Sequence, residues 1–345
     1  MKTQAIQIDP IVDLRKISAF RAENFPYSEQ IPWLDRDDWR SQISHRLASG
    51  EIGEDEATLC RHWAENGYVV IPSAFSKRQL KEAWSDYEQG IANSSLIPQE
   101  DHAISVQSRL PGRVLNPHFK VAAFEKILRD QQMVDIVSLL LGVTALPFQT
   151  IAGHKGSEQL PHSDSIHMTT YPQGFLIANW IAFEDIAPDS GPLQYYPGSH
   201  RMPYAYSREC GIGLDEARAS YAAYHQKYET FVQKQIANGD LQPHFFYAKT
   251  GDVLFWHANL LHGGSRIQNA TSSRHALVCH YFAEGCICYH DYTGSPSHLT
   301  KIPFLEREDF NEATYLKLNP DVAAAGADAY GHYVDYGFKE GRPVR

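Results

Sequence analysis

The segment 251–282, which reads GDVLFWHANLLHGGSRIQNATSSRHALVCHYF, decides how the rest of this chain of 345 residues is interpreted. Its two apolar runs, GDVLFWHA and RHALVCHYF, flank a stretch rich in Gly, Ser and Asn, as expected of two β-strands joined by a long turn. Similar runs occur upstream, as ALPFQTIAG at 145–153, FLIANWIAFEDI at 175–186 and PLQYYPGS at 192–199. Many short strands separated by Pro- and Gly-containing turns predict a mainly β protein with a double-stranded β-helix core, the jelly-roll or cupin-like fold.

The sequence before these strands is helical in character. EATLCRHWAENG predicts a helix that ends at Gly67, and the YVVIP that follows predicts a short strand. Ser76 lies three residues before Gln79, the spacing of a capping box, at the start of a second helix with one apolar stripe. A third helix is predicted over 121–141 from its apolar spacing. The fold class is therefore mainly β with helical flanks.

Changes in composition divide the chain into three regions. Residues 1–58 combine Pro, aromatic and charged residues without a clear period, and predict a helical or irregular N-terminal extension. Residues 59–303 form the predicted jelly-roll domain, which a helical insert interrupts near 208–235. Residues 304–345 are rich in Ala, Tyr and Gly, and predict a helical C-terminal appendage.

The composition argues against several classes of function. The chain has 31 Lys and Arg against 41 Asp and Glu, a formal net charge of −10, and no basic run, so no nucleic-acid partner is expected. No stretch approaches the ~20 apolar residues of a transmembrane helix, and the N-terminus lacks the pattern of a secretory signal. The five scattered cysteines lack paired C-x-x-C spacing, as expected of reduced thiols in a cytoplasmic protein. The 17 histidines justify a search for a metal site.

The triplet His162-Ser163-Asp164 is the first candidate for that site. On a strand, residues i and i+2 point to the same face, so the imidazole and the carboxylate would converge. About one H-x-D is expected by chance in a chain of this composition, so the triplet alone means little. His262, between the two strands of the segment 251–282 and at the start of a Gly-Gly turn, supplies a second imidazole. Two neutral imidazoles and one carboxylate form the facial triad of non-haem iron sites.

A facial triad leaves three coordination positions open. A bidentate 2-oxo acid occupies two of them and O2 the third, and the far carboxylate of the 2-oxo acid needs a fixed cation. Arg has the fork geometry for that carboxylate. Arg274, twelve residues beyond His262, is predicted to be this cation, and Arg266, inside the turn, is expected to point to solvent.

Three segments, in their order along the chain, resemble the phytanoyl-CoA dioxygenase family of Fe(II)/2-oxoglutarate oxygenases: PHSDS, DSGPLQYYPGSH, and WHANLLHGGS with a following Arg. The resemblance covers roughly residues 60–290 and includes NGYVVIP. It implies Fe(II) and 2-oxoglutarate as cofactor and co-substrate, with O2, and a substrate hydroxylation that releases succinate and CO2. The residues that it implies are the iron ligands His162, Asp164 and His262, the 2-oxoglutarate anchor Arg274, and two further co-substrate contacts, Trp180 and Gln149.

Several other side chains near these motifs have alternative explanations. Whether Ser265, His167 or His257 contacts a ligand stays open, and for His257 an orientation toward the cavity is one of the alternatives. Trp256 is expected in the core, and His200 is expected to stabilise a turn. The histidines without ligand spacing are expected to be structural or exposed; they are His280, His290 and His298.

The C-terminal sequence YLKLNPDVAAAGADAYGHYVDYGFKEGRPVR is similar to a short helical tail of various bacterial proteins, including glycosyltransferases of surface polysaccharide pathways. That similarity implies docking to a glycan or a pathway partner, and packing on the barrel or on a second copy in a homo-oligomer is the alternative. The expected substrate is a small molecule, or a saccharide or lipid-linked compound. Two alternative functions remain at this point: a non-catalytic glycan-binding jelly-roll protein, and a cupin-like metal enzyme that does not use 2-oxoglutarate.

Overall fold

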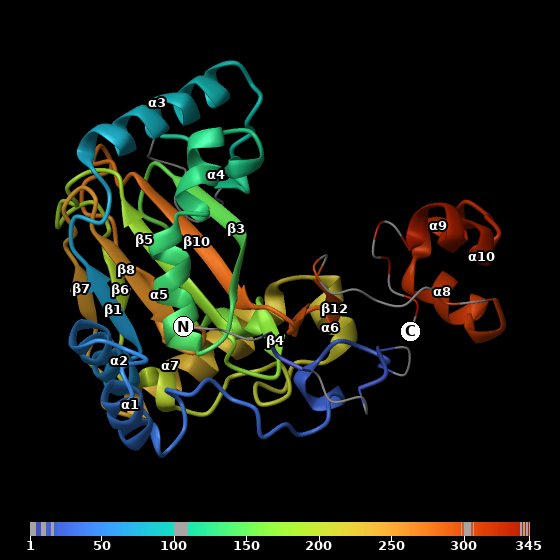
Figure 1. Cartoon of the computed structure of the whole chain (residues 1–345). Helices are drawn as coiled ribbons and strands as arrows, with labels where there is room; N and C mark the ends of the chain where they lie inside the picture. Colours follow the sequence, from blue (N-terminus) through green and yellow to red (C-terminus); the bar gives the residue numbers. More distant parts are fainter. Residues whose placement is uncertain are drawn as a thin grey trace.

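The computed structural model of the protein describes residues 5–7, 12–14, 17–99, 110–297, 299, 305, 307–338, 340, 342 and 344. Its largest element is an antiparallel sheet of six strands in the order β1-β8-β5-β10-β3-β2 (Figure 1). The strands of this sheet are β1 (Tyr68–Ile71), β8 (Val253–His257), β5 (Leu176–Ala182), β10 (Ala276–Ala283), β3 (Ala145–Gly153) and β2 (Val114–Leu115).

Two sheets of three strands complete the double-stranded β-helix. The first has the order β7-β6-β9, and the second has the order β12-β11-β4. Their bounds are β7 (His244–Phe246), β6 (Leu193–Tyr195), β9 (His262–Gly264), β12 (Ser295–Pro296), β11 (Ile287–His290) and β4 (Thr169–Tyr171). The predicted jelly-roll fold with helical flanks is confirmed.

Alternate residues of the large sheet enter two different cores. On one face, Ala178 and Trp180 of β5 pack with Leu254 of β8 and with Leu193 and Phe246 of the β7-β6-β9 sheet. On the other face, the intervening residues pack against helices. Both faces of β5 and β8 are therefore buried, which explains why their sequences are continuously apolar rather than alternating.

Helices cover the second face of the large sheet (Figure 1). They are α1 (Trp39–Ala48), α2 (Glu54–Asn66), α3 (Lys77–Ala92), α4 (Ala122–Leu128) and α5 (Gln131–Leu141). As predicted, α2 ends at Gly67, which adopts the left-handed conformation at φ 77°. The Ser76 hydroxyl accepts a hydrogen bond from the Gln79 backbone N–H at 3.2 Å, so the predicted cap of α3 is also confirmed.

The prediction of one helix over 121–141 is wrong, because the chain forms α4 and α5 with a break between them. Asp130 causes the break: its carboxylate accepts hydrogen bonds from the backbone N–H groups of Gln132 and Met133. Asp competes for backbone donors in this way, which favours a new helix start over a continuous helix. Apolar periodicity runs through such a break and does not reveal it.

The remaining helical segments lie outside the large sheet. The insert contains α6 (Leu214–Ala219), the π-helical turn η6 (Tyr224–Tyr228) and α7 (Glu229–Asn238). The C-terminal appendage contains α8 (Glu312–Leu318), α9 (Pro320–Ala324), α10 (Ala329–His332) and the π-helical turn η8 (Tyr333–Gly337), which enclose their own apolar cluster. Short 3-10 turns occur at η2 (Ala22–Asn24), η3 (Pro117–Phe119), η4 (Asp164–Ile166), η5 (Ser199–Arg201) and η7 (Arg307–Asp309).

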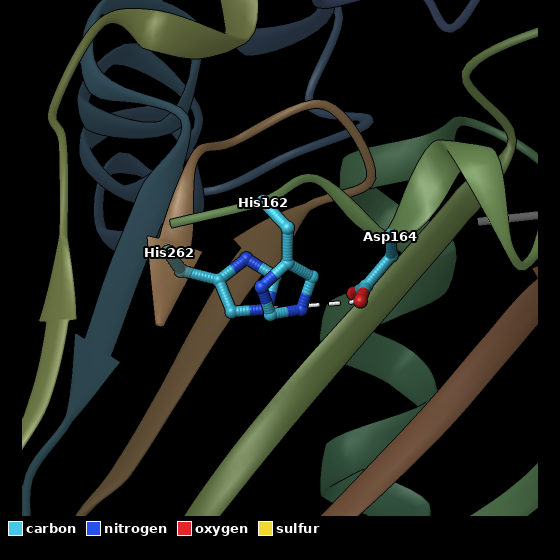
Figure 2. Close-up of side chains that lie close together, drawn as sticks. All are labelled: His162, Asp164 and His262. Carbon is cyan, nitrogen blue, oxygen red and sulfur yellow. Dashed lines mark ion pairs between the residues drawn. The ribbon is translucent and has the colours of Figure 1, made fainter. Parts of the chain in front are cut away.

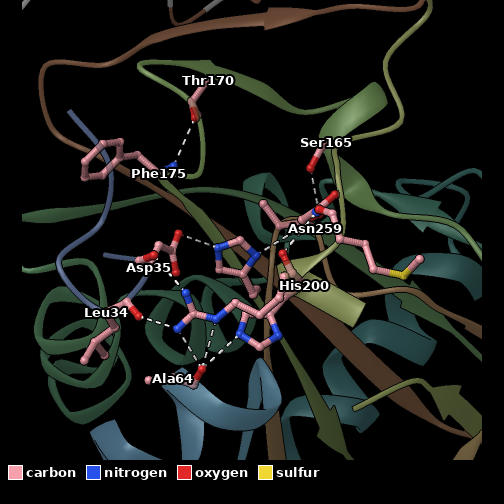
Figure 3. A network of polar contacts seen from close by, with 12 residues as sticks. Leu34, Asp35, Ala64, Ser165, Thr170, Phe175, His200 and Asn259 are labelled. Carbon is pink, nitrogen blue, oxygen red and sulfur yellow. Dashed lines mark hydrogen bonds and ion pairs between the residues drawn. The ribbon is translucent and has the colours of Figure 1, made fainter. Parts of the chain in front are cut away.

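A polar network fastens the N-terminal extension to the jelly roll (Figure 3). Arg201 donates hydrogen bonds to the backbone carbonyls of Leu34, Asp35 and Ala64 at 2.8 to 2.9 Å. The Asp35 carboxylate lies 3.0 Å from Nε2 of His257. Burial alone would raise the pKa of Asp35, but the neighbouring His257 lowers it below its usual value. The extension is thus tied to β8 by an ionised carboxylate.

The five cysteines all lie in the described part of the chain and are free thiols. No helix in the described ranges combines the length and the apolar character that crossing a bilayer requires.

Candidate active site

His162 and His262 are joined by their main chains. Each backbone N–H donates to the carbonyl oxygen of the other residue at 2.9 Å, which makes an antiparallel β-bridge between segments 100 positions apart. The two imidazole centroids lie 4.6 Å apart as a result. His262 begins strand β9, not a turn as predicted. The next residue of this strand, Gly263, must be a glycine, because a Cβ atom there would lie 2.5 Å from the Gln159 carbonyl oxygen.

Asp164 completes the cluster from a different kind of backbone. It is the first residue of the 3-10 turn η4, and the prediction that the triplet His162-Ser163-Asp164 lies on a strand is wrong in this respect. The turn still directs the carboxylate toward the histidines, with Oδ1 at 3.6 Å from Nε2 of His262 (Figure 2). Candidate ligand atoms of the three buried residues all lie within 4.8 Å of one another.

The same local arrangement fixes the proton on both imidazoles. Nδ1 of His162 lies 2.9 Å from the Leu160 carbonyl oxygen, and Nδ1 of His262 lies 2.9 Å from the Leu260 carbonyl oxygen. Since a carbonyl only accepts, Nδ1 carries the proton in each ring and Nε2 presents a lone pair. Burial lowers the pKa of both rings to about 4, aided at His162 by the nearby His262, so both are neutral at pH 7. Two imidazole lone pairs and one carboxylate are a donor set that fits Fe(II).

The cluster opens into a cavity of about 610 Å³ inside the β-helix. That volume lies within the range of small-molecule sites. The cavity walls include all six residues selected from the sequence: His162, Asp164, His262, Arg274, Trp180 and Gln149.

Arg274 presents a buried positive charge to this cavity. One terminal nitrogen donates to the Gly191 carbonyl oxygen at 2.8 Å, and the guanidinium carbon lies 5.7 Å from the Trp180 ring centroid. Within the described part of the chain, the Nε–H has no hydrogen-bond partner. Burial, and then the charge of Arg113, lower the pKa of Arg274 to about 10, which leaves it charged at pH 7. A buried cation with an unpaired donor fits an anionic ligand such as a carboxylate.

Arg266, the competing arginine, is exposed and does not line the cavity. Ser265 also lies outside the cavity lining, and its hydroxyl donates to the Pro192 carbonyl oxygen at 2.8 Å. His200 contacts the Ala64 carbonyl oxygen at 3.3 Å, in line with the structural role expected for it.

Two neighbours on β8 point to opposite faces of the large sheet. Trp256 lines the cavity, and its indole N–H donates to Oδ2 of Asp164 at 2.7 Å. His257 points to the opposite face, where it meets Asp35. Trp256 packs in the apolar core as predicted and also lines the cavity, whereas His257, whose orientation the sequence left open, does not face the cavity.

Sequence reasoning missed further cavity residues. His280 lines the cavity with Nε2 at 4.0 Å from Oδ2 of Asp164, and burial lowers its pKa to about 4. The signal for His280 was available, because it lies six residues after Arg274 and every second residue of β10 faces the same way. Arg113 and His290 also line the cavity, and no spacing rule pointed to them; His167, whose contact with a ligand the sequence left open, lines it as well. His298 lies outside the described residues.

The geometry agrees with what comparisons with known proteins find. The family model for phytanoyl-CoA dioxygenase (PhyH) matches residues 63–276. The peroxisomal phytanoyl-CoA dioxygenase of Rattus norvegicus is 25% identical over 248 residues, which cover 66% of this chain and 68% of the rat protein. The ectoine dioxygenase of Nocardia farcinica is 25% identical over 274 residues, which cover 77% of this chain and 85% of that enzyme.

Solved structures show the same fold. EctD from S. alaskensis, with 2-oxoglutarate and 5-hydroxyectoine, superposes with a TM-score of 0.54 at 16% identity, over 89% of this chain and 90% of EctD. The carbocyclase SnoK from nogalamycin biosynthesis has a TM-score of 0.53 at 17% identity, over 70% of this chain and 88% of SnoK. With its family model, its fold and its buried triad in agreement, the chain belongs to the phytanoyl-CoA dioxygenase (PhyH) family and is a non-haem Fe(II)- and 2-oxoglutarate-dependent dioxygenase.

Proposed function

We propose that His162, Asp164 and His262 hold the iron, that Arg274 anchors 2-oxoglutarate, and that the enzyme hydroxylates an organic substrate in the same cavity. One observation carries this proposal: the buried triad and the unpaired Nε–H of Arg274 face a single cavity. That arrangement and the family membership favour a dioxygenase over a glycan-binding protein without turnover and over a metal enzyme that does not use 2-oxoglutarate.

Iron, with 2-oxoglutarate and O2, supplies the oxidising chemistry when bound. The side chains of this protein supply position and charge. Arg274 neutralises and orients the far carboxylate of 2-oxoglutarate, and the Trp180 ring beside it forms the wall that fixes the chain of the co-substrate. The Gln149 amide, whose N–H₂ contacts only the weak acceptor Sδ of Met168 at 3.4 Å in the described structure, is available to bind a co-substrate oxygen. Because Asp164 is present, no ligand position is left vacant for a halide, which favours hydroxylation over halogenation.

The substrate end of the cavity lies beside the helical insert. Among the residues that line the cavity are neutral rings and hydroxyl groups, which belong to His167, Tyr221, His290, Thr293, Ser295 and Ser297. Burial lowers the pKa of His167 and of His290, so both rings are neutral. Neutral rings and hydroxyls suit a substrate that itself carries hydroxyl groups, which supports a saccharide or another polar small molecule.

An apolar part of the cavity wall is compatible with a lipid-linked form of such a substrate. Leu115 is 46% exposed although it lines the cavity, and Phe148 lines the same wall. Apolar side chains in the cavity wall suit a ligand with an apolar portion.

The experiment that tests the proposed function has two stages. Anaerobic protein is first titrated with Fe(II) and then with 2-oxoglutarate, while the metal-to-ligand charge-transfer band is recorded; saturable formation of the band is expected. Succinate release is then measured with O2 across a panel of saccharides and lipid-linked sugars, and mass spectrometry searches for a product heavier by one oxygen atom. Absence of the charge-transfer band with folded protein would contradict the ligand assignment. Absence of a hydroxylated product with every saccharide and lipid-linked sugar of the panel would contradict the substrate class.

A further inference from the structure

The two carboxylate oxygens of Asp164 have different surroundings. Oδ1 faces the histidines, at 3.6 Å from Nε2 of His262. Oδ2 accepts a hydrogen bond from the indole N–H of Trp256 at 2.7 Å. His280 approaches Oδ2 with Nε2 at 4.0 Å, which is beyond hydrogen-bond distance. The indole therefore occupies one oxygen and leaves the other directed at the metal position.

The packing of Trp256 holds its indole N–H in a fixed direction, toward Oδ2 of Asp164. It lies on β8 between two hydrogen-bonded neighbours, opposite Tyr68 on β1 and Ala178 on β5. Its side chain is 2% exposed, and its ring centroid lies 4.7 Å from that of His262. A fully packed Trp on a central strand has few alternative rotamers, so the N–H direction is set by the fold.

We propose that Trp256 is a positioning residue that makes Asp164 a monodentate iron ligand through the N–H···Oδ2 hydrogen bond. A carboxylate that bound iron through both oxygens would occupy a fourth coordination position, and one of the three needed by 2-oxoglutarate and O2 would be lost. A charge-assisted hydrogen bond to Oδ2 opposes the rotation of the carboxylate that would bring both oxygens to the iron, and it keeps Oδ1 directed at the metal position. This inference rests on the ligand assignment proposed above.

The test uses Co(II) as a probe, because it occupies Fe(II) sites without reacting with O2 rapidly and has a visible ligand-field spectrum. Trp256→Phe keeps an aromatic ring and removes the N–H donor. Loss of a hydrogen-bond partner behind a metal ligand typically costs about 10–100-fold in metal affinity. We therefore expect calorimetric titration to show Co(II) affinity reduced by about tenfold or more, and the ligand-field spectrum of the bound Co(II) to change.

A matched control is Trp33→Phe. Its indole N–H donates to the Leu139 carbonyl oxygen at 2.8 Å, in a buried position that does not line the cavity. This variant loses a hydrogen bond of the same kind, and its Co(II) affinity and spectrum should match those of the wild type. Thermal unfolding of both metal-free variants reports whether each folds.

If Trp256→Phe does not fold, 3-benzothienylalanine incorporated at position 256 replaces it, since that residue keeps the size of the indole and lacks only the N–H. Wild-type Co(II) affinity and spectrum in a folded protein that lacks the N–H would overturn the positioning role and leave the ligand assignment intact. Failure of the wild type itself to bind Co(II) would overturn the ligand assignment, and this inference with it.

Discussion

His262 and His200 are both buried histidines, but only His262 lines the cavity. Replacing His262 with Ala removes one of three proposed iron ligands, and we expect both iron retention and 2-oxoglutarate turnover to be abolished. His200→Ala removes an equally buried imidazole, and its loss should lower stability without releasing iron. Iron content after anaerobic gel filtration, with succinate release, distinguishes the two variants. Full iron occupancy in His262→Ala would show that the triad is assigned wrongly.

Arg274 and Arg266 provide a second matched pair. Arg274→Lys keeps the positive charge but loses the planar guanidinium. It thereby removes the buried Nε–H that has no hydrogen-bond partner in the described structure. We expect 2-oxoglutarate affinity to fall by roughly tenfold or more, since charge-assisted hydrogen bonds are worth about 1.5–3 kcal/mol. Arg266→Lys, at an exposed position, should change the affinity by less than about threefold. The charge-transfer band of the anaerobic Fe(II) protein reports both affinities, and the opposite order would move the anchor into the turn.

Among the larger elements, the N-terminal extension contacts β8 through the Asp35 carboxylate, which pairs with His257 at 3.0 Å. Asp35→Asn replaces the ionised partner of His257, and we expect the free energy of unfolding to fall by about 1–3 kcal/mol at pH 7. The pKa of Asp35 is lowered in the folded protein, so its contribution is present above the unfolded pKa of about 3.9 and is lost as pH falls through the folded value. Urea unfolding from pH 7 to pH 3 should therefore show the difference from the wild type shrinking below about pH 4.

Asp38→Asn is the control for this prediction. Asp38 belongs to the same extension and pairs with Arg36 at 3.0 Å, but the carboxylate is solvent-exposed. Solvent and salt screen such a pair, so the variant should lose much less stability than Asp35→Asn at pH 7. An equal loss of stability in both variants would mean that the contact with His257 does not fasten the extension.

The jelly-roll fold and the cluster of His162, Asp164 and His262 could be predicted from sequence, whereas the order of the strands and the orientation of single side chains on β8 could not. The sequence left the orientation of His257 open because both faces of β8 are buried, so alternation gives no polarity signal. Orientation there depends on β9 and on Asp35, which lie at distant positions in the chain. Asp164 was correctly selected for the site although its backbone is a 3-10 turn, because the motif specifies the donor atoms and not the strand.

At the scale of the whole molecule, the C-terminal appendage encloses its own apolar cluster around Phe310, Tyr315 and Tyr333. In Figure 1 its helices, coloured red, form a separate group to the right of the β-sheets. Within the appendage, the Leu305 backbone N–H donates a hydrogen bond to the Tyr333 hydroxyl, and the Leu305 carbonyl oxygen accepts one from the Tyr330 hydroxyl. Since the cavity lining contains none of its described residues, deletion of 304–345 should leave 2-oxoglutarate binding and basal succinate release unchanged.

The same deletion is expected to weaken binding of a glycan or pathway partner if the appendage serves as a docking unit. Circular dichroism and thermal unfolding establish that the shortened protein is folded before binding is compared. A folded protein without residues 304–345 that no longer binds 2-oxoglutarate would show that the appendage supports the jelly roll.

Exchange of the amide hydrogens of His162 and His262 with deuterium should be coupled, because each amide donates to the carbonyl oxygen of the other residue. A single opening event exposes both, although 100 positions separate them. Iron bound to both side chains makes that opening rarer, and both amides should then exchange more slowly by the same factor. Peptide-level deuterium uptake at these two sites thus measures how often the bridge between the two histidines opens.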